Sequence, residues 1–149
     1  MHLKKIKIFL FFFFLFFQYF SFLCASELKF GSVIIKNKSF LFNVEIADTK
    51  EKREKGLMFR SVLDEEGGML FVLPKPYFAN IWMKNTVLSL DIIFISEDNI
   101  IVDLLKEALP LSEEIYSSRM KTKYILEINS GLIEKLGIDI GDEVYIEYE

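Results

Sequence analysis

Short runs of apolar residues, rich in β-branched and aromatic side chains, dominate the chain from residue 28 onward. Runs of this length, bounded by turn residues, are typical of β-strands. They predict about eight strands, over Leu28–Ile35, Lys38–Ala47, Gly68–Leu73, Phe78–Met83, Asp91–Ile95, Ile100–Leu105, Tyr124–Asn129 and Glu143–Tyr148. The first two are expected to form a hairpin that turns at Lys36-Asn37. Several runs are apolar on both faces, as central strands of a barrel or sandwich are.

Two short helices are expected between these strands. The first covers Thr49–Lys55, because Asp48 and Glu51 resemble a capping box and Gly56 suits the left-handed position after a helix. The second covers Gly131–Leu136 on similar grounds.

The segment Leu109–Thr122 has no clear period and is expected to be a loop. Together the elements predict one mainly β (α+β) domain over residues 26–149, a small β-barrel or sandwich with two short helices. The pattern does not define the order of the strands.

The start of the chain has a different pattern. Three lysines within His2–Lys7 precede the apolar run Ile8–Phe17, and the small residues Cys24-Ala25-Ser26 follow. This order is typical of a secretory signal peptide. It predicts a signal peptide over residues 1–25, cleaved after Ala25 or Ser26, and a protein exported to the periplasm or the cell exterior.

Two alternatives to cleavage stay open. Ile8–Leu23 is slightly shorter than the ~20 residues that span a bilayer, so an uncleaved membrane anchor is one alternative, and contact with a membrane is expected only in that form. The other is a lipoprotein that carries its lipid on Cys24.

Loss of the leader changes the chemistry that the chain can use. The only histidine and the only cysteine, His2 and Cys24, lie in it, so the mature domain has neither imidazole, thiol nor disulfide. We expect no metal site and no cofactor. The formal charge is −4 for the whole chain, and the three leader lysines leave −7 for residues 26–149. Nucleic-acid binding is not expected, because it needs a basic face.

The first group of candidate site residues lies on the helix expected over residues 49–55. Side chains three and four positions apart share a face, so Arg53 aligns with Leu57, the expected core contact. Lys50, Lys52 and Lys55 are expected to face water. Arg53 either pairs with a carboxylate or clamps an anionic ligand through its planar guanidinium group.

The second group lies at the end of a predicted strand. Asn80, Trp82 and Lys84 share one strand face, and the face carries the only tryptophan of the chain. It is either a ligand platform, or Trp82 is a core residue followed by a turn at Asn85-Thr86.

The third candidate is Asp91, which lies on a strand that is apolar on both faces. A buried carboxylate needs a partner or becomes protonated. Arg53, Arg60 and Lys84 are the candidate partners. Asp91 is therefore either a structural ion-pair partner or an acid with a raised pKa in a pocket.

An ordered series of sequence blocks resembles a known family. The blocks are Val44-Glu45-Ile46-Ala47-Asp48, Glu51 to Arg60, Gly68-Met69-Leu70-Phe71, Trp82 to Thr86, Leu90 to Phe94, Tyr124 to Glu127, and Leu136 to Asp142. Over residues 33–149 they are similar to the prokaryotic family called domain of unknown function 192. The resemblance implies a compact β-rich domain, often exported, and no established activity. It carries over as ligand-site candidates Arg53, Arg60, Trp82, Met83, Lys84, Asn85 and Asp91.

These observations favour a binding or interaction module for a small polar or anionic ligand, or for a protein of the cell envelope. One alternative is a carboxylate-dependent hydrolase such as a glycosidase, with Asp91 as one of its two acids. The other is a structural envelope protein without a pocket.

Overall fold

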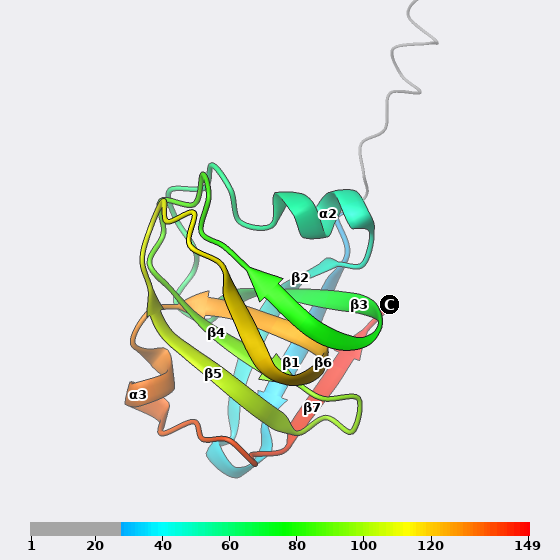
Figure 1. The fold of residues 1–149 in the computed structure, drawn as a ribbon. Coiled ribbons are helices and arrows are strands. Elements are labelled where there is room, and N and C mark those ends of the chain that lie inside the picture. Colours follow the sequence, from blue (N-terminus) through cyan, green and yellow to red (C-terminus); the bar gives the residue numbers. More distant parts are fainter. Residues whose placement is uncertain (1–27) are drawn as a thin grey trace, which may run out of the picture.

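The computed structural model describes residues 28–149, which contain seven strands, two helices and one 3-10 turn. The strands are β1 (Phe30–Ile35), β2 (Phe40–Ala47), β3 (Gly67–Ile81), β4 (Leu90–Ile95), β5 (Ile101–Ala108), β6 (Tyr116–Asn129) and β7 (Val144–Tyr148). The other elements are η1 (Lys36–Lys38), α2 (Lys50–Lys55) and α3 (Leu132–Leu136). The strands form one curled sheet in the order β5-β4-β6-β3-β2-β1-β7 (Figure 1). The predicted mainly β class with two short helices is confirmed, and the sheet forms a half-barrel.

The expected hairpin is present, since β1 and β2 pair antiparallel on either side of η1. The β2 and β3 strands pair parallel, with Val44 opposite Gly68. Parallel neighbours cannot be joined by a tight turn and need a crossover. The crossover here contains α2, which therefore lies over the sheet beside β2 and β3 (Figure 1).

Two predicted strands, Gly68–Leu73 and Phe78–Met83, are one continuous strand, β3. Its register with β6 shifts between Val72 and Tyr77, where Pro74 and Pro76 supply no N–H group for pairing. The Nζ of Lys123 on β6 donates instead to the carbonyls of Leu73 at 2.8 Å and of Pro74 at 3.3 Å. The prolines thus bend the strand without ending it.

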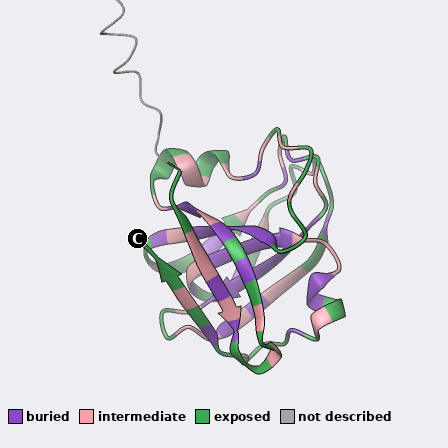
Figure 2. Ribbon diagram, turned by 180° about the vertical axis from the view of Figure 1, so that it is seen from behind, coloured by how far each residue is buried: buried purple, intermediate pink, exposed green. Residues whose placement is uncertain are grey.

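The expected loop over Leu109–Thr122 is wrong in its second half. Residues Tyr116–Thr122 form the first part of β6 and pair with the distal part of β3 from Tyr77 to Ile81. The segment lacks a clear apolar period because this long ribbon extends past the core and is exposed on much of its surface (Figure 2).

The expected cap of α2 is also corrected. Thr49, not Asp48, precedes the helix, and its Oγ1 accepts a hydrogen bond from the Lys52 N–H at 3.2 Å. The Asp48 carboxylate instead pairs with Lys29 at 3.0 Å and with Lys52 at 3.5 Å. Lys52 is therefore half-buried rather than fully in water.

The two faces of the sheet carry separate groups of buried side chains. The inner core fills the hollow of the half-barrel with Val33, Phe42, Leu70, Leu126, Ile128 and their neighbours. The outer cluster lies on the opposite face and includes Leu57, Met69, Phe71, Ile92, Phe94 and Ile125. Leu57, which follows α2, is 1% exposed, so its predicted core contact is confirmed.

None of the helices in the described part of the chain is both long and apolar enough to cross a membrane. The predicted signal peptide lies outside the described residues.

Candidate functional site

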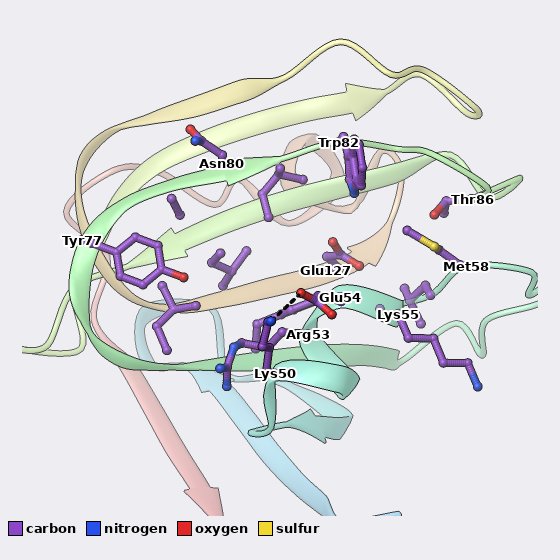
Figure 3. Close-up of a pocket in the computed structure, with 17 residues that line it drawn as sticks. Lys50, Arg53, Glu54, Lys55, Met58, Tyr77, Asn80, Trp82, Thr86 and Glu127 are labelled. Atoms are coloured by element: carbon purple, nitrogen blue, oxygen red, sulfur yellow. Dashed lines mark ion pairs between the residues drawn. The ribbon is translucent and has the colours of Figure 1, made fainter.

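A cavity of about 480 Å³ opens between α2 and the curled ribbon of β3 and β6 (Figure 3). We call it the α2 pocket. Its lining combines apolar side chains of the outer cluster with charged and aromatic side chains at the mouth. The lining residues are Lys50, Arg53, Glu54, Lys55, Gly56, Leu57, Met58, Phe71, Leu73, Tyr77, Ala79, Asn80, Ile81, Trp82, Thr86, Ile125 and Glu127.

Glu127 is the most buried titratable residue of the pocket. It lies on β6, directly between Met69 of β3 and Ile92 of β4, so neither sheet neighbour offers a polar side chain. Glu127 is only 6% exposed, and its carboxyl group points into the cavity (Figure 3). No residue of 28–149 makes a hydrogen bond or ion pair with this carboxyl group.

This burial changes the acidity of the group. Loss of water around the charged form raises the pKa of Glu127 from 4.5 to about 8. The carboxyl group is therefore protonated at neutral pH unless something in the pocket stabilises its charge. Acids with this combination of burial and cavity access are typical of functional sites.

Two aromatic residues lie at the mouth. Trp82 follows β3 and is 46% exposed, and Tyr77 is 39% exposed. They lie on different sides of Glu127, with Trp82 on the far side of the cavity from α2 (Figure 3). The Nζ of Lys84 lies 5.2 Å from the centre of the Trp82 ring, within the range of a cation–π contact. Trp82 is thus exposed at the surface rather than a core residue.

The α2 side of the mouth carries three cations. Arg53 Nη1 donates to the carbonyls of Asp48 at 2.6 Å and Val72 at 3.0 Å, so its expected pairing with a carboxylate is wrong. Lys50 pairs with Glu54 at 3.6 Å, and both side chains are well exposed. Lys55 points away from the cavity (Figure 3).

Three of the other candidates next to Trp82 have structural contacts. Met83 is buried, and its N–H donates to the Ser112 carbonyl at 2.9 Å. Asn85 has a left-handed backbone (φ 57°) and accepts the Phe59 N–H at 2.9 Å. Lys84 pairs with Glu113 at 3.6 Å. None of the three lines the α2 pocket.

Arg60 also lies outside the pocket. It makes a two-pronged ion pair with Glu45 on β2, through Nη1 to Oε1 and through Nη2 to Oε2 at 2.6 Å. The hydrogen bonds from Glu45 raise the pKa of Arg60 further above its usual value. Its observed role is to fix the segment after α2 to the sheet.

Asp91 is completely buried, but it is not the partner of any of the three predicted cations. Its Oδ1 accepts the Glu107 N–H at 2.9 Å, and its Oδ2 accepts the Ile133 N–H at 2.8 Å. It therefore joins β4 to β5 and to the first turn of α3, away from the α2 pocket. The predicted ion pair of Asp91 is therefore wrong, since backbone amides take the place of a cation.

Of the seven candidates, the α2 pocket brings together only Arg53 and Trp82. The sequence analysis missed Glu127, although a signal was present. Glu127 stands between Leu126 and Ile128 in a strand that is apolar on both faces, which is the argument applied above to Asp91. Among residues 28–149, no three acidic side chains lie close enough to hold a metal ion.

Comparison with known proteins identifies the family of the chain. Residues 33–146 match the family model DUF192, described as "Uncharacterized ACR". The chain belongs to the DUF192 family. A UPF0127 protein of Thermococcus sibiricus is 36% identical over 116 residues, which cover 76% of this chain and 72% of that protein.

Two solved structures share the DUF192 fold of this chain. A Novosphingobium aromaticivorans protein of unknown function has a TM-score of 0.73 and 38% identity, over 79% of this chain and 84% of its own. A Sinorhizobium meliloti protein, provisionally titled a transcription regulator, has a TM-score of 0.75 and 34% identity, over 83% and 96%. These similarities establish the family and the fold, and they support no specific activity.

Proposed function

We propose that this DUF192 domain is a binding module that holds a small polar organic molecule in the α2 pocket. The observation that carries the proposal is the carboxyl group of Glu127, which is buried at the base of an open cavity without a partner. Its carboxyl oxygens are not sealed from the cavity. A ligand in the pocket can therefore donate a hydrogen bond to Glu127.

The rest of the lining supports a ligand of mixed character. Binding sites for small molecules are usually concave and largely apolar, with a few convergent polar groups. The α2 pocket has apolar walls at Leu57, Phe71 and Ile125, the carboxyl group of Glu127, and aromatic surface at its mouth. Its volume lies in the range of roughly 300–1,000 Å³ that such sites have.

A hydrolase is the second candidate, because a protonated Glu127 could act as a general acid. A glycosidase needs a second carboxylate across the scissile bond. Asp91 does not reach this pocket, and Glu54, the other acid of the lining, is well exposed on α2 rather than buried across the cavity. The geometry thus favours binding over hydrolysis.

The test is a thermal-shift screen of the purified protein against sugars, nucleotides, amino acids and organic acids. A ligand at 100 times its Kd should stabilise the fold by about 2.7 kcal/mol. We expect Glu127→Gln and Trp82→Ala to lose the shift. Glu147→Gln and Tyr145→Ala, on exposed positions of β7, should keep it. If no compound stabilises the wild type, a protein of the cell envelope replaces the small molecule as the proposed partner.

Export remains part of this proposal, since it rests on the leader pattern alone. Mass spectrometry of the protein from its host should give a mature N-terminus at Ser26 or Glu27. An intact Met1 would overturn cleavage, and a lipid on Cys24 would assign the protein to the lipoproteins.

A further inference from the structure

An acid lies at the base of the α2 pocket, and two cations, Lys50 and Arg53, line its mouth. We propose that the pocket takes a small zwitterion of the amino-acid type, with its ammonium group against Glu127 and its carboxylate against Lys50 and Arg53. This inference rests on the proposed function and names the class of ligand.

The surroundings of Glu127, at the base of the pocket, favour a cationic hydrogen-bond donor on the ligand. Glu127 has apolar neighbours on both adjacent strands, Met69 and Ile92. No described residue donates to it. A hydroxyl group would supply a hydrogen bond, whereas an ammonium group would supply both a hydrogen bond and the opposite charge, and charge-assisted bonds are roughly twice as strong.

The side chains at the mouth favour an anionic group on the ligand. Arg53 is fixed there because a single nitrogen, Nη1, binds two backbone carbonyls, and an arginine has further N–H donors on the other two nitrogens. Among residues 28–149, Lys50 forms an ion pair with Glu54 alone, and the side chains of this pair are 77% and 66% exposed. Exposed pairs of this kind are weak, so a ligand carboxylate can replace Glu54 as the partner of Lys50.

The two ends together favour a ligand that carries both charges. A simple amine would meet the charges of Lys50 and Arg53 as it enters, and a simple acid would leave Glu127 without a cationic partner. The body of the ligand would lie against apolar side chains such as Leu57 and Ile125, beside Trp82 (Figure 3). The cavity volume of about 480 Å³ is sufficient for an amino acid with a large side chain.

Binding of such a ligand should release a proton. The other titratable groups that line the cavity are Lys50, Arg53, Glu54, Lys55 and Tyr77. Burial raises the pKa of Glu127 to about 8, and a bound ammonium group would hold the carboxylate ionised. At pH 7 each binding event should therefore release about 0.9 of a proton, and affinity should rise roughly tenfold per pH unit below pH 8.

The experiment is isothermal titration of the purified protein with matched probes. L-phenylalanine is compared with N-acetyl-L-phenylalanine, which lacks the ammonium group, and with phenethylamine, which lacks the carboxylate. L-leucine, N-acetyl-L-leucine and isoamylamine form a second set. We expect at least one amino acid to bind tenfold or more tightly than both of its analogues. Titrations in phosphate and in Tris, whose ionisation enthalpies differ, give the number of protons released.

Variants assign each end of the ligand. Glu127→Gln should remove the advantage over the acetylated analogue and the proton release, while Lys50→Met should reduce the advantage over the amine. Glu147→Gln and Lys106→Met are the matched controls, both outside the pocket lining, and should bind as the wild type does. The pH profile of the wild type tests the same contact should Glu127→Gln fail to fold.

Several outcomes would overturn the inference. Equal affinity for the three members of both sets would show that the pocket does not distinguish ligands by their charges. Tighter binding of the amines would leave no role for Lys50 and Arg53. If the amino acids fail to bind while another compound stabilises the wild type through Glu127, the zwitterion is wrong and the proposed function stands. If no compound binds, both fail.

Discussion

Two buried acids on strands that flank β4 have opposite surroundings. Asp103 of β5 is fully buried, and its carboxylate accepts hydrogen bonds from the Tyr116 hydroxyl at 3.0 Å, the Arg119 N–H at 2.8 Å and the Leu104 N–H at 2.9 Å, as well as from the Arg119 guanidinium group. Glu127 of β6 is nearly as buried and accepts none from the described residues. The fold thus supplies Asp103 with a full set of hydrogen-bond donors and leaves Glu127 open to a cavity.

The difference shows in the acidity of the two groups. Burial alone would raise the pKa of Asp103, but the hydrogen bonds from Arg119 and the backbone outweigh it and hold the pKa below its usual value. At Glu127 burial acts unopposed. Asp103 as a charge therefore stabilises the contact between β5 and the first part of β6, whereas Glu127 costs stability when it is charged, as binding groups often do.

The pH dependence of stability should separate the two acids most clearly. The pKa of Glu127 is raised from 4.5 to about 8, so the folded state retains a proton that the unfolded state loses. The stability that this gives is complete below pH 4.5 and is lost as the pH rises to 8. The free energy of unfolding of the wild type, relative to Glu127→Gln, should fall by up to about 5 kcal/mol across that window. Urea unfolding at a series of pH values measures it.

Parallel pH profiles of wild type and Glu127→Gln would contradict the unpaired state of Glu127. Glu147→Gln, which changes an exposed acid, is the control and should leave the profile unchanged.

Substitution of Asp103, whose carboxylate is fully hydrogen-bonded, should instead lower the stability of the fold. Asp103→Asn removes the charge that holds Arg119 and places an amide N–H₂ against groups that are all donors. We expect a loss of about 3 kcal/mol at pH 7, the upper end of the cost of leaving buried hydrogen-bonding groups unsatisfied, since Asp103 is buried although Arg119 is exposed. Because the pKa of Asp103 is lowered, its contribution is present above pH 3.8 and lost as the pH falls further. A loss below 1 kcal/mol, or an equal loss in the exposed control Asp98→Asn, would show that the network is dispensable.

The comparison also shows what the sequence can predict. The hairpin of β1 and β2 and both short helices follow from local periodicity and turn residues, and they were predicted within a few positions. The continuity of β3 was not predicted, because Pro74 and Pro76 are local breaks that pairing with β6 overrides. This pairing links positions some 40 residues apart, as in Tyr77 opposite Thr122, which no local pattern contains.

The site depended on the same kind of distant contact. Arg53 and Trp82 were predicted from their own neighbourhoods in the sequence. Asp91 and Glu127 have the same sequence signal, a lone acid in an apolar strand, and they differ only in what reaches them. Amides from β5 and α3 satisfy Asp91, while α2 leaves a cavity above Glu127. This difference is a property of the packing.

A third acid, Asp91, tests whether hydrogen bonds from backbone amides alone stabilise a buried carboxylate. Asp91→Asn keeps the shape of the side chain but offers N–H₂ to one of two backbone donors, Glu107 N–H or Ile133 N–H. We expect a loss of about 2 kcal/mol and faster hydrogen exchange at these two amides. If both amides stay protected, the carboxylate does not hold α3 and β5 together.

The smallest expected effect concerns the element that covers Glu127. Thr49→Ala removes the hydroxyl group that caps α2, a change that typically costs about 1 kcal/mol, whereas Thr49→Ser keeps it. We expect faster hydrogen exchange at the Lys52 N–H, which donates a hydrogen bond to Thr49 Oγ1, and unchanged exchange in β4. Because fraying of α2 admits water to Glu127, the pKa of Glu127 should move down toward 4.5 in Thr49→Ala, as NMR titration of its carboxyl carbon would measure. An unchanged pKa with a frayed helix would mean that the sheet, rather than α2, keeps water from the acid.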